Sequence, residues 1–197
     1  MNYRLGFLGA GNMAEAIARA AIDKGVLVAS EIIASDPVEA RRQVFEELGM
    51  GVTSSNAAAI GQSQQVLIAV KPQQMADAAA DLAQNGSEEQ VLISIMAGIG
   101  SAKLEEAVGR PSRIVRVMPN TPLMSGAGMA GVALGGHAEK GDDELAMQIF
   151  SAAGEAIRVD EASIDAITAV SGSGPAYLFY LAEAMHRAAT ELGLADH

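Results

Sequence analysis

The fold is decided near the start of the chain, by the stretch Leu5-Gly6-Phe7-Leu8-Gly9-Ala10-Gly11-Asn12-Met13-Ala14. Residues 5–8 are a short apolar run of the kind that forms a buried strand, and two glycines follow at once. From residue 13 to residue 22, apolar side chains recur at the spacing of one helix face. A strand, a glycine turn and a helix in this order are the context in which a G-x-G-x-x-G/A motif indicates a dinucleotide site.

Each small residue of this motif has a physical role. Gly9 permits the tight turn, Gly11 lets the backbone approach a pyrophosphate, and Ala14 lets the helix pack closely on the strand. The helix N-terminus adds free N–H groups and a partial positive charge for the phosphates. The alternative is a glycine turn in another kind of α/β protein, and the flanking strand and helix count against it.

The composition excludes several classes of protein. The 197 residues carry 13 Lys and Arg against 24 Asp and Glu, a net charge of −11, so a nucleic-acid groove is not expected. There is no cysteine for a disulfide or a thiolate metal site, and His137, His186 and His197 lack the spacing of metal ligands. Neither a signal-type leader nor an apolar run of membrane length is visible. We therefore expect a cytoplasmic protein of one domain, or of one domain plus a small appendage.

Strand and helix patterns alternate along most of the chain, which predicts an α/β fold with a parallel sheet and crossover helices. We assign residues 1–161 to a dinucleotide-binding domain of the Rossmann type. The fully apolar run 66–70 is typical of a central parallel strand, whereas 52–53 is expected at an edge. The other expected strands are 5–8, 32–34, 91–95, 114–117, 126–134 and 156–159. The expected helices are 13–22, 40–48, 56–60, 74–84, 101–108 with Ser101 as its N-cap, and 142–152.

The pattern changes after residue 161, and residues 162–197 are expected to form a helical interface segment. A helix over 161–170 is interrupted by Ser171-Gly172-Ser173-Gly174-Pro175, with Pro175 in the place of a first helical residue. From 176 to 192 the polar side chains fall on one narrow stripe, and the rest of the helix is apolar or alanine. We expect this helix to pack against a second copy of the chain, or else to stay loosely ordered.

The candidate ligand site lies beyond the carboxyl ends of the strands, where open parallel sheets bind their ligands. Five loops rich in glycine, proline and small polar residues meet there: 9–13, 35–37, 71–72, 96–98 and 118–122. Asp36 either accepts hydrogen bonds from the ribose hydroxyls of NADH or caps the next helix. Ser35, with Arg41 and Arg42 nearby, would instead accept the 2′-phosphate of NADPH. The choice between the two cofactors stays open.

Three further features have two readings each. Lys71, the only lysine at a strand's carboxyl end, either donates to a nicotinamide or ribose oxygen or is solvated. Residues 118–122 form either a stiff loop with fixed donors or a plain turn. Residues 171–174 suit either a carboxylate cradle ahead of a helix N-terminus or an interhelical hinge. His137 and His186 are expected at the surface.

Four blocks of the chain, in this order, resemble the pyrroline-5-carboxylate reductase family, which makes proline from its cyclic imine using NADPH or NADH. They are Gly9-Ala10-Gly11-Asn12-Met13, Ala69-Val70-Lys71-Pro72, Met118-Pro119-Asn120-Thr121-Pro122 and Val170-Ser171-Gly172-Ser173-Gly174-Pro175-Ala176-Tyr177. The resemblance covers essentially the whole chain, and the last block is the most specific. It implies that 162–197 are the start of a C-terminal all-helical dimerisation domain in a homodimer or higher homo-oligomer.

The resemblance also implies the site residues. Those that would contact NADPH or NADH are Leu8, Gly9, Ala10, Gly11, Asn12, Met13, Ser35, Asp36, Asn56, Ala69, Val70, Lys71, Pro72, Ile95, Met96 and Ala97. Asn120 would lie near the nicotinamide and the substrate, a small imine carboxylate. Ser171, Gly172, Ser173 and Gly174 would bind that substrate. Family members continue with helices that complete the dimer and the carboxylate site, so we expect a C-terminally truncated chain that binds dinucleotide and turns over slowly.

The implied reaction is hydride transfer from the nicotinamide to the C=N carbon of a cyclic imine acid. A protonated imine is already electrophilic, so we assign no catalytic acid and no metal. Two other readings are a dinucleotide-binding module without catalysis and a relative of the β-hydroxyacid dehydrogenases. The latter would need a lysine on the helix after the sheet, and residues 162–192 contain none.

Overall fold

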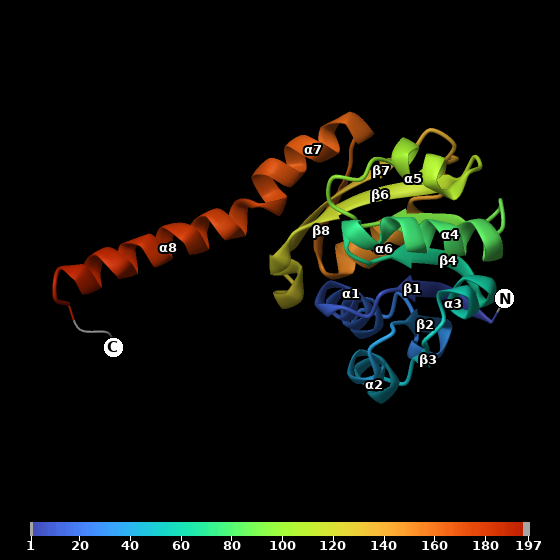
Figure 1. Ribbon diagram of the computed structural model, residues 1–197, viewed down its shortest axis with the longest axis horizontal. Coiled ribbons are helices and arrows are strands. Elements are labelled where there is room, and N and C mark those ends of the chain that lie inside the picture. The colour runs from blue at the N-terminus through green and yellow to red at the C-terminus, as the bar shows by residue number, and fades with distance from the viewer. Residues whose placement is uncertain (1, 195–197) are drawn as a thin grey trace.

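The computed structural model describes residues 2–194 and contains a single eight-stranded sheet (Figure 1). The strand order is β3-β2-β1-β4-β5-β6-β7-β8, and every neighbouring pair is parallel except β6 and β7. The strands are β1 (Tyr3–Leu8), β2 (Ile32–Ser35), β3 (Gly51–Thr53), β4 (Ser63–Ile68), β5 (Val91–Ser94), β6 (Arg113–Pro119), β7 (Gly128–Leu134) and β8 (Gly154–Arg158). This order confirms the expected edge position of 52–53 and the central position of the apolar run that begins at 66. The run ends as a strand at Ile68, so Ala69 and Val70 belong to the loop.

Helices cover both faces of the sheet. The helices of the domain are α1 (Asn12–Asp23), α2 (Glu39–Glu47), α3 (Asn56–Gln62), α4 (Met75–Asn85), α5 (Ser101–Val108) and α6 (Glu144–Ala152). One buried cluster joins α1, α2 and α6 to one face, and a second joins α3, α4 and α5 to the other. Successive strand residues serve opposite faces, so Phe7 belongs to the first cluster and Leu8 to the second. Each such buried side chain contributes about 1.5–3 kcal/mol, which explains why the central strands are apolar throughout.

The segment after β8 is helical but irregular. A 3-10 turn η4 (Glu161–Ser163), a single α turn α7 (Ile164–Ile167), a π turn η5 (Thr168–Gly172) and the helix α8 (Gly174–Glu191) follow one another. The helix expected over 161–170 is thus a series of short turns, and its expected interruption at 171–175 begins earlier, as the π turn over residues 168–172. Residues 174 and 175 already belong to α8, with Pro175 in its first turn. Figure 1 shows α8 projecting away from the sheet, and none of its residues is buried.

The N-cap of α5 differs from the expectation. Gly100 is the N-cap, Ser101 is the first helical residue, and the Ser101 hydroxyl donates to Glu161, which lies 60 positions further along the chain. A partner so distant in sequence overrides the local preference of serine for the cap position. Among the described residues, no helix is both long and apolar enough to cross a membrane.

Candidate functional site

A cleft of about 990 Å³ opens at the carboxyl ends of β1, β2 and β4. We call it the main cleft. It is the place at which an open parallel sheet binds its ligands, because the strand order reverses direction beside β1. It is lined by Gly9, Gly11, Ser35, Asp36, Pro37, Val38, Arg41, Ser54, Ser55, Asn56, Ala57, Ala69, Val70, Lys71, Gln74, Asp77, Ala78 and Asp81.

The glycine loop between β1 and α1 has the geometry that a pyrophosphate needs. Gly9 has a φ of +93°, and a Cβ there would lie 3.1 Å from the carbonyl atoms of Ala69, so the position excludes other residues. Gly11 is the N-cap of α1, and a Cβ there would meet no protein atom within 4 Å. The space beside Gly11 is thus open at the positive end of a helix, which fits a bound dinucleotide phosphate.

Asp36 holds this loop in place. Its Oδ2 accepts the Ala10 N–H at 2.9 Å, and its Oδ1 accepts the Val38 N–H at 2.9 Å. Val38 is itself the N-cap of α2, so Asp36 does not cap that helix, and this alternative was wrong. The carboxylate instead bridges the glycine loop and its own turn, and it faces the main cleft.

Arg41 is the cationic side chain nearest to the glycine loop. Its Nε donates to the Ala10 carbonyl at 2.6 Å, and its Nη2 pairs with Glu15 at 2.9 Å. Burial alone would raise the pKa of Glu15, but the hydrogen bonds and charges of Arg41 and Arg19 outweigh it and lower that pKa. Glu15 therefore stays ionised and keeps Arg41 on the loop. Arg42 binds the carbonyls of Asp36 and Pro37 and does not line the cleft.

Polar side chains join the walls of the main cleft. The buried Ser35 hydroxyl lies 3.0 Å from the Phe7 carbonyl and 2.7 Å from Asn56 Oδ1. Asn56 Nδ2 in turn donates to Asp81 Oδ2 on α4 at 2.9 Å. The end of β2, the start of α3 and the face of α4 are thereby fixed relative to one another.

A smaller cavity of about 300 Å³ adjoins the main cleft, and Ala69, Val70 and Lys71 line both spaces. We call it the side pocket. Its other lining residues are Met13, Pro72, Ile95, Met96, Ala97, Met118, Pro119, Asn120, Thr121 and Gly172. Lys71 is the only ionisable side chain among these lining residues. The walls are otherwise apolar or neutral, which suits a site that keeps water away from a reacting centre.

Asn120 connects two segments that lie far apart in the sequence. Its Oδ1 accepts the Met129 N–H at 2.9 Å, and its Nδ2 donates to Ser171 Oγ at 3.2 Å. The loop after β6 is therefore a stiff connector rather than a plain turn. Through it, the π turn η5 is held against the side pocket, and Gly172 of that turn lines the pocket wall.

Most of the predicted site residues meet in these two spaces. Leu8 and Ala10 are completely buried and line neither cavity, and Asn12 is exposed outside both. Ser171 reaches the side pocket through Asn120, whereas Ser173 and Gly174 do not line it. Their roles toward cofactor and substrate stay predictions. His137 is exposed beside Glu105, and His186 is exposed on α8, as expected.

Several residues that line the main cleft were not predicted from the sequence. Gln74, Asp77 and Asp81 belong to this group, whereas Arg41 was named as a possible neighbour of the 2′-phosphate. The spacing of Asp77 and Asp81 puts both on one face of α4, which is a signal that the sequence contains. Among the described residues, no group of three acidic or histidine side chains is arranged to hold a metal ion.

Comparison with known proteins decides the family. A family model for pyrroline-5-carboxylate reductase dimerisation matches residues 161–197, and one for F420-dependent NADP oxidoreductases matches residues 4–98. A pyrroline-5-carboxylate reductase of Pseudomonas aeruginosa is 43% identical over 194 residues, which are 98% of this chain and 71% of that protein. The chain belongs to the pyrroline-5-carboxylate reductase family.

Solved structures of the family agree with the fold. The pyrroline-5-carboxylate reductase of Coxiella burnetii superposes with a TM-score of 0.84 at 34% identity, over 99% of this chain and 73% of that one. The Plasmodium falciparum enzyme, solved with NADP bound, superposes with a TM-score of 0.84 at 29% identity, over 98% and 71% of the two chains. The Rossmann-type domain and the helical dimerisation segment of this family member are thus confirmed as its fold.

Proposed function

We propose that this chain reduces 1-pyrroline-5-carboxylate to L-proline, using NADPH or NADH. The observation that carries the proposal is that the two cavities adjoin. The main cleft begins at the glycine loop, and it shares the lining residues Ala69, Val70 and Lys71 with the side pocket. A dinucleotide whose pyrophosphate lies at Gly11 would place its nicotinamide in the side pocket, beside Asn120 and Gly172.

The residues of the chain then bind, orient and exclude water. A bound reduced dinucleotide supplies a hydride, which forms the new C–H bond at the imine carbon while the C=N double bond becomes a single bond. The imine arrives protonated and leaves as an amine, so no side chain has to donate a proton. Among the described residues that line the side pocket, Lys71 is the one ionisable side chain. The apolar walls hold the two rings together and account for the rate by proximity.

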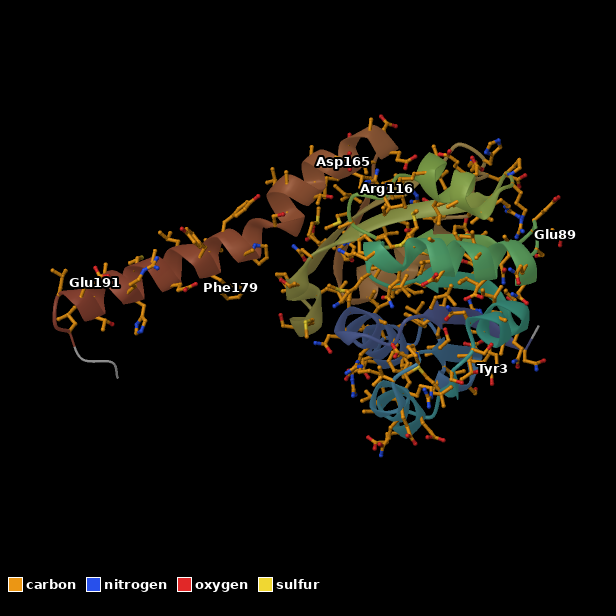
Figure 2. The ribbon with its side chains drawn as sticks, viewed as in Figure 1. Tyr3, Glu89, Arg116, Asp165, Phe179 and Glu191 are labelled. Atoms are coloured by element: carbon orange, nitrogen blue, oxygen red, sulfur yellow. The ribbon has the colours of Figure 1, made fainter. Side chains whose placement is uncertain are left out.

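The helix α8 is proposed to form the homo-oligomer interface. Leu178, Phe179, Tyr180 and Met185 are between 65% and 73% exposed, and Figure 2 shows Phe179 on the part of α8 that extends beyond the sheet. Burying several such side chains contributes about 1.5–3 kcal/mol each, which favours association with a second copy. Phe179→Glu is expected to shift the chain to a monomer in light scattering, and an unchanged oligomer would contradict this interface.

The reaction is tested by following the oxidation of NADPH and NADH spectroscopically with and without racemic pyrroline-5-carboxylate, and by measuring proline in the same samples. We expect imine-dependent oxidation with one proline formed for each dinucleotide oxidised. Oxidation without proline, or none at all, would contradict the proposal.

We further propose that the reaction takes place in the cytoplasm, where two charged, water-soluble reactants meet. Activity confined to a membrane fraction of cells that express the protein would contradict that location.

A further inference from the structure

Glu161, at the start of the helical segment, is the centre of a cluster that lies outside both cavities. One carboxylate oxygen accepts the Ser101 backbone N–H at 2.7 Å, and the other accepts the Ser101 hydroxyl. Arg116 Nη1 lies 3.6 Å from Glu161 Oε1, and Arg116 Nη2 donates to Asp165 Oδ1 at 2.6 Å. Figure 2 shows Arg116 and Asp165 beside each other where α7 meets the sheet.

Burial and charge explain why these groups belong together. The Arg116 side chain is only 8% exposed, and a buried guanidinium requires carboxylate partners. Ser101 is the first residue of α5, where backbone N–H groups lack partners within the helix and a negative charge is favourable. Glu161 satisfies both demands at once. Asp165 is 78% exposed, so Glu161 is the more enclosed of the two carboxylates.

The cluster also joins three of the segments that line the side pocket, those of residues 95–97, 118–121 and 172. Ser101 follows the loop of Ile95, Met96 and Ala97. Arg116 precedes Met118 on β6, and Glu161 leads through α7 into the π turn η5. At the far end these segments touch again. A Cβ on Gly172 would lie 2.6 Å from Met118 Cε, and Asn120 binds Ser171.

We propose that Arg116 and Glu161 are positioning residues for imine reduction, which hold η5 at a fixed distance from the loops around the nicotinamide end. The inference rests on the proposed function. The two side chains line neither cavity, so they do not contact a ligand directly. Because they connect α5, β6 and α7, their loss shifts the segments around the side pocket and leaves the glycine loop as it is. They therefore act on turnover of the imine and not on dinucleotide affinity.

The kinetic test compares Glu161→Gln and Arg116→Lys with a matched control, Arg113→Lys. Arg113 lies on the same strand and pairs with the buried Asp142, and within residues 2–194 its hydrogen bonds and ion pairs go to Glu89, Glu139 and Asp142. Misplacement of reacting groups by less than 1 Å is costly, so we expect kcat to fall about tenfold in the two test variants, with dinucleotide Kd changed by less than about twofold. Arg113→Lys is expected to keep the wild-type kcat even where it lowers the melting temperature equally. Wild-type kcat in Glu161→Gln, or an equal loss of kcat in Arg113→Lys, would overturn the proposal.

Hydrogen–deuterium exchange supplies a measurement that does not depend on turnover. Exchange in peptides covering residues 164–174 is expected to be about tenfold faster in Glu161→Gln than in wild type, because η5 loses its anchor, and unchanged in Arg113→Lys. Unchanged exchange in Glu161→Gln would overturn the positioning role. A wild-type chain that does not reduce the imine would overturn the proposed function instead, so the two failures are distinguishable.

Discussion

The main cleft and the side pocket lie at the same edge of the sheet, but they are held together in different ways. The glycine loop, where the main cleft begins, depends on backbone geometry within one strand-turn-helix unit, at Gly9 and Gly11, and on one carboxylate, that of Asp36. The side pocket depends on side-chain contacts between segments 51 and 60 positions apart, Asn120 with Ser171 and Ser101 with Glu161. This difference means that dinucleotide binding and imine turnover can be impaired separately.

The largest expected effect is at the glycine loop. Gly11 has a φ of −71°, which any residue adopts, and open space beside it, so Gly11→Val leaves the fold intact but fills the place of the pyrophosphate. We expect dinucleotide affinity to fall about 100-fold, which corresponds to a misfit of about 2–3 kcal/mol. The fold is retained, with a slightly lower melting temperature because valine is a poorer N-cap than glycine. Fluorescence titration measures the affinity.

Two other glycines act as controls for this variant. Gly136 has equally open space and lies away from both cavities, so Gly136→Val is expected to bind dinucleotide normally. Gly9→Ala is expected to lower the melting temperature as well, because its φ of +93° is unfavourable for alanine. Normal affinity in Gly11→Val would remove the glycine turn from the site.

The next effect is at the side pocket. Gly172→Ala places a methyl group 2.6 Å from Met118 Cε and pushes that side chain into the pocket. We expect kcat/KM for the imine to fall about tenfold, because a misfit of this kind costs about 1–2 kcal/mol. The dinucleotide Kd is expected to stay unchanged. Shortening Met118 to alanine in the same chain should recover part of the loss in a double-mutant cycle. A loss of dinucleotide affinity equal to the loss of turnover would show that the two regions are not separable.

A smaller effect is expected at Asp36. Asp36→Ser removes a negative charge from the cleft, and we expect the affinity for NADPH to rise relative to that for NADH by about 1 kcal/mol, or about fivefold. Affinity for both cofactors should also fall somewhat, because the Ala10 N–H loses its acceptor. Asp36→Asn removes the charge but keeps one oxygen that can accept the Ala10 N–H, so it distinguishes the effect of the charge from that of the hydrogen bond. If the ratio of the NADPH and NADH affinities does not change, Asp36 only supports the glycine loop and does not select the cofactor.

The smallest effect concerns Glu15 and pH. Because the folded-state pKa of Glu15 is lowered from 4.5, its carboxylate stabilises the fold above that value, and the contribution is lost as the pH falls through the lowered pKa. At neutral pH the wild type is therefore expected to have a slightly higher melting temperature than Glu15→Gln. The difference in the free energy of unfolding is less than about 1 kcal/mol, because the ion pairs of Glu15 are partly exposed, and it vanishes in acid. Thermal melts across the acid range measure this. A difference that grows on acidification would contradict the sign.

The same contrast explains what the sequence could predict. The glycine loop, the central and edge strands and the loops that line the cleft depend on local patterns, so they were predicted from residues a few positions apart. Ser101 was placed wrongly at a cap because Glu161, its actual partner, is remote, and Asp36 was taken for a possible cap although it supports Ala10. The local pattern left residues 171–174 as either a carboxylate cradle or a hinge. Their place near the nicotinamide came from family resemblance, because no local pattern shows that Ser171 meets Asn120.

We infer that a dinucleotide extends from the main cleft into the side pocket, and that its nicotinamide there passes a hydride to an imine bound beside it. The most direct measurement of this transfer uses reduced dinucleotide with deuterium at both C4 positions of the nicotinamide, pyrroline-5-carboxylate, and mass spectrometry of the product. We predict proline one mass unit heavier, with the deuterium on the ring carbon beside nitrogen that does not carry the carboxylate, and far less of it from Gly11→Val at the same subsaturating dinucleotide concentration. Unlabelled proline, or equal labelled proline from Gly11→Val, would contradict it.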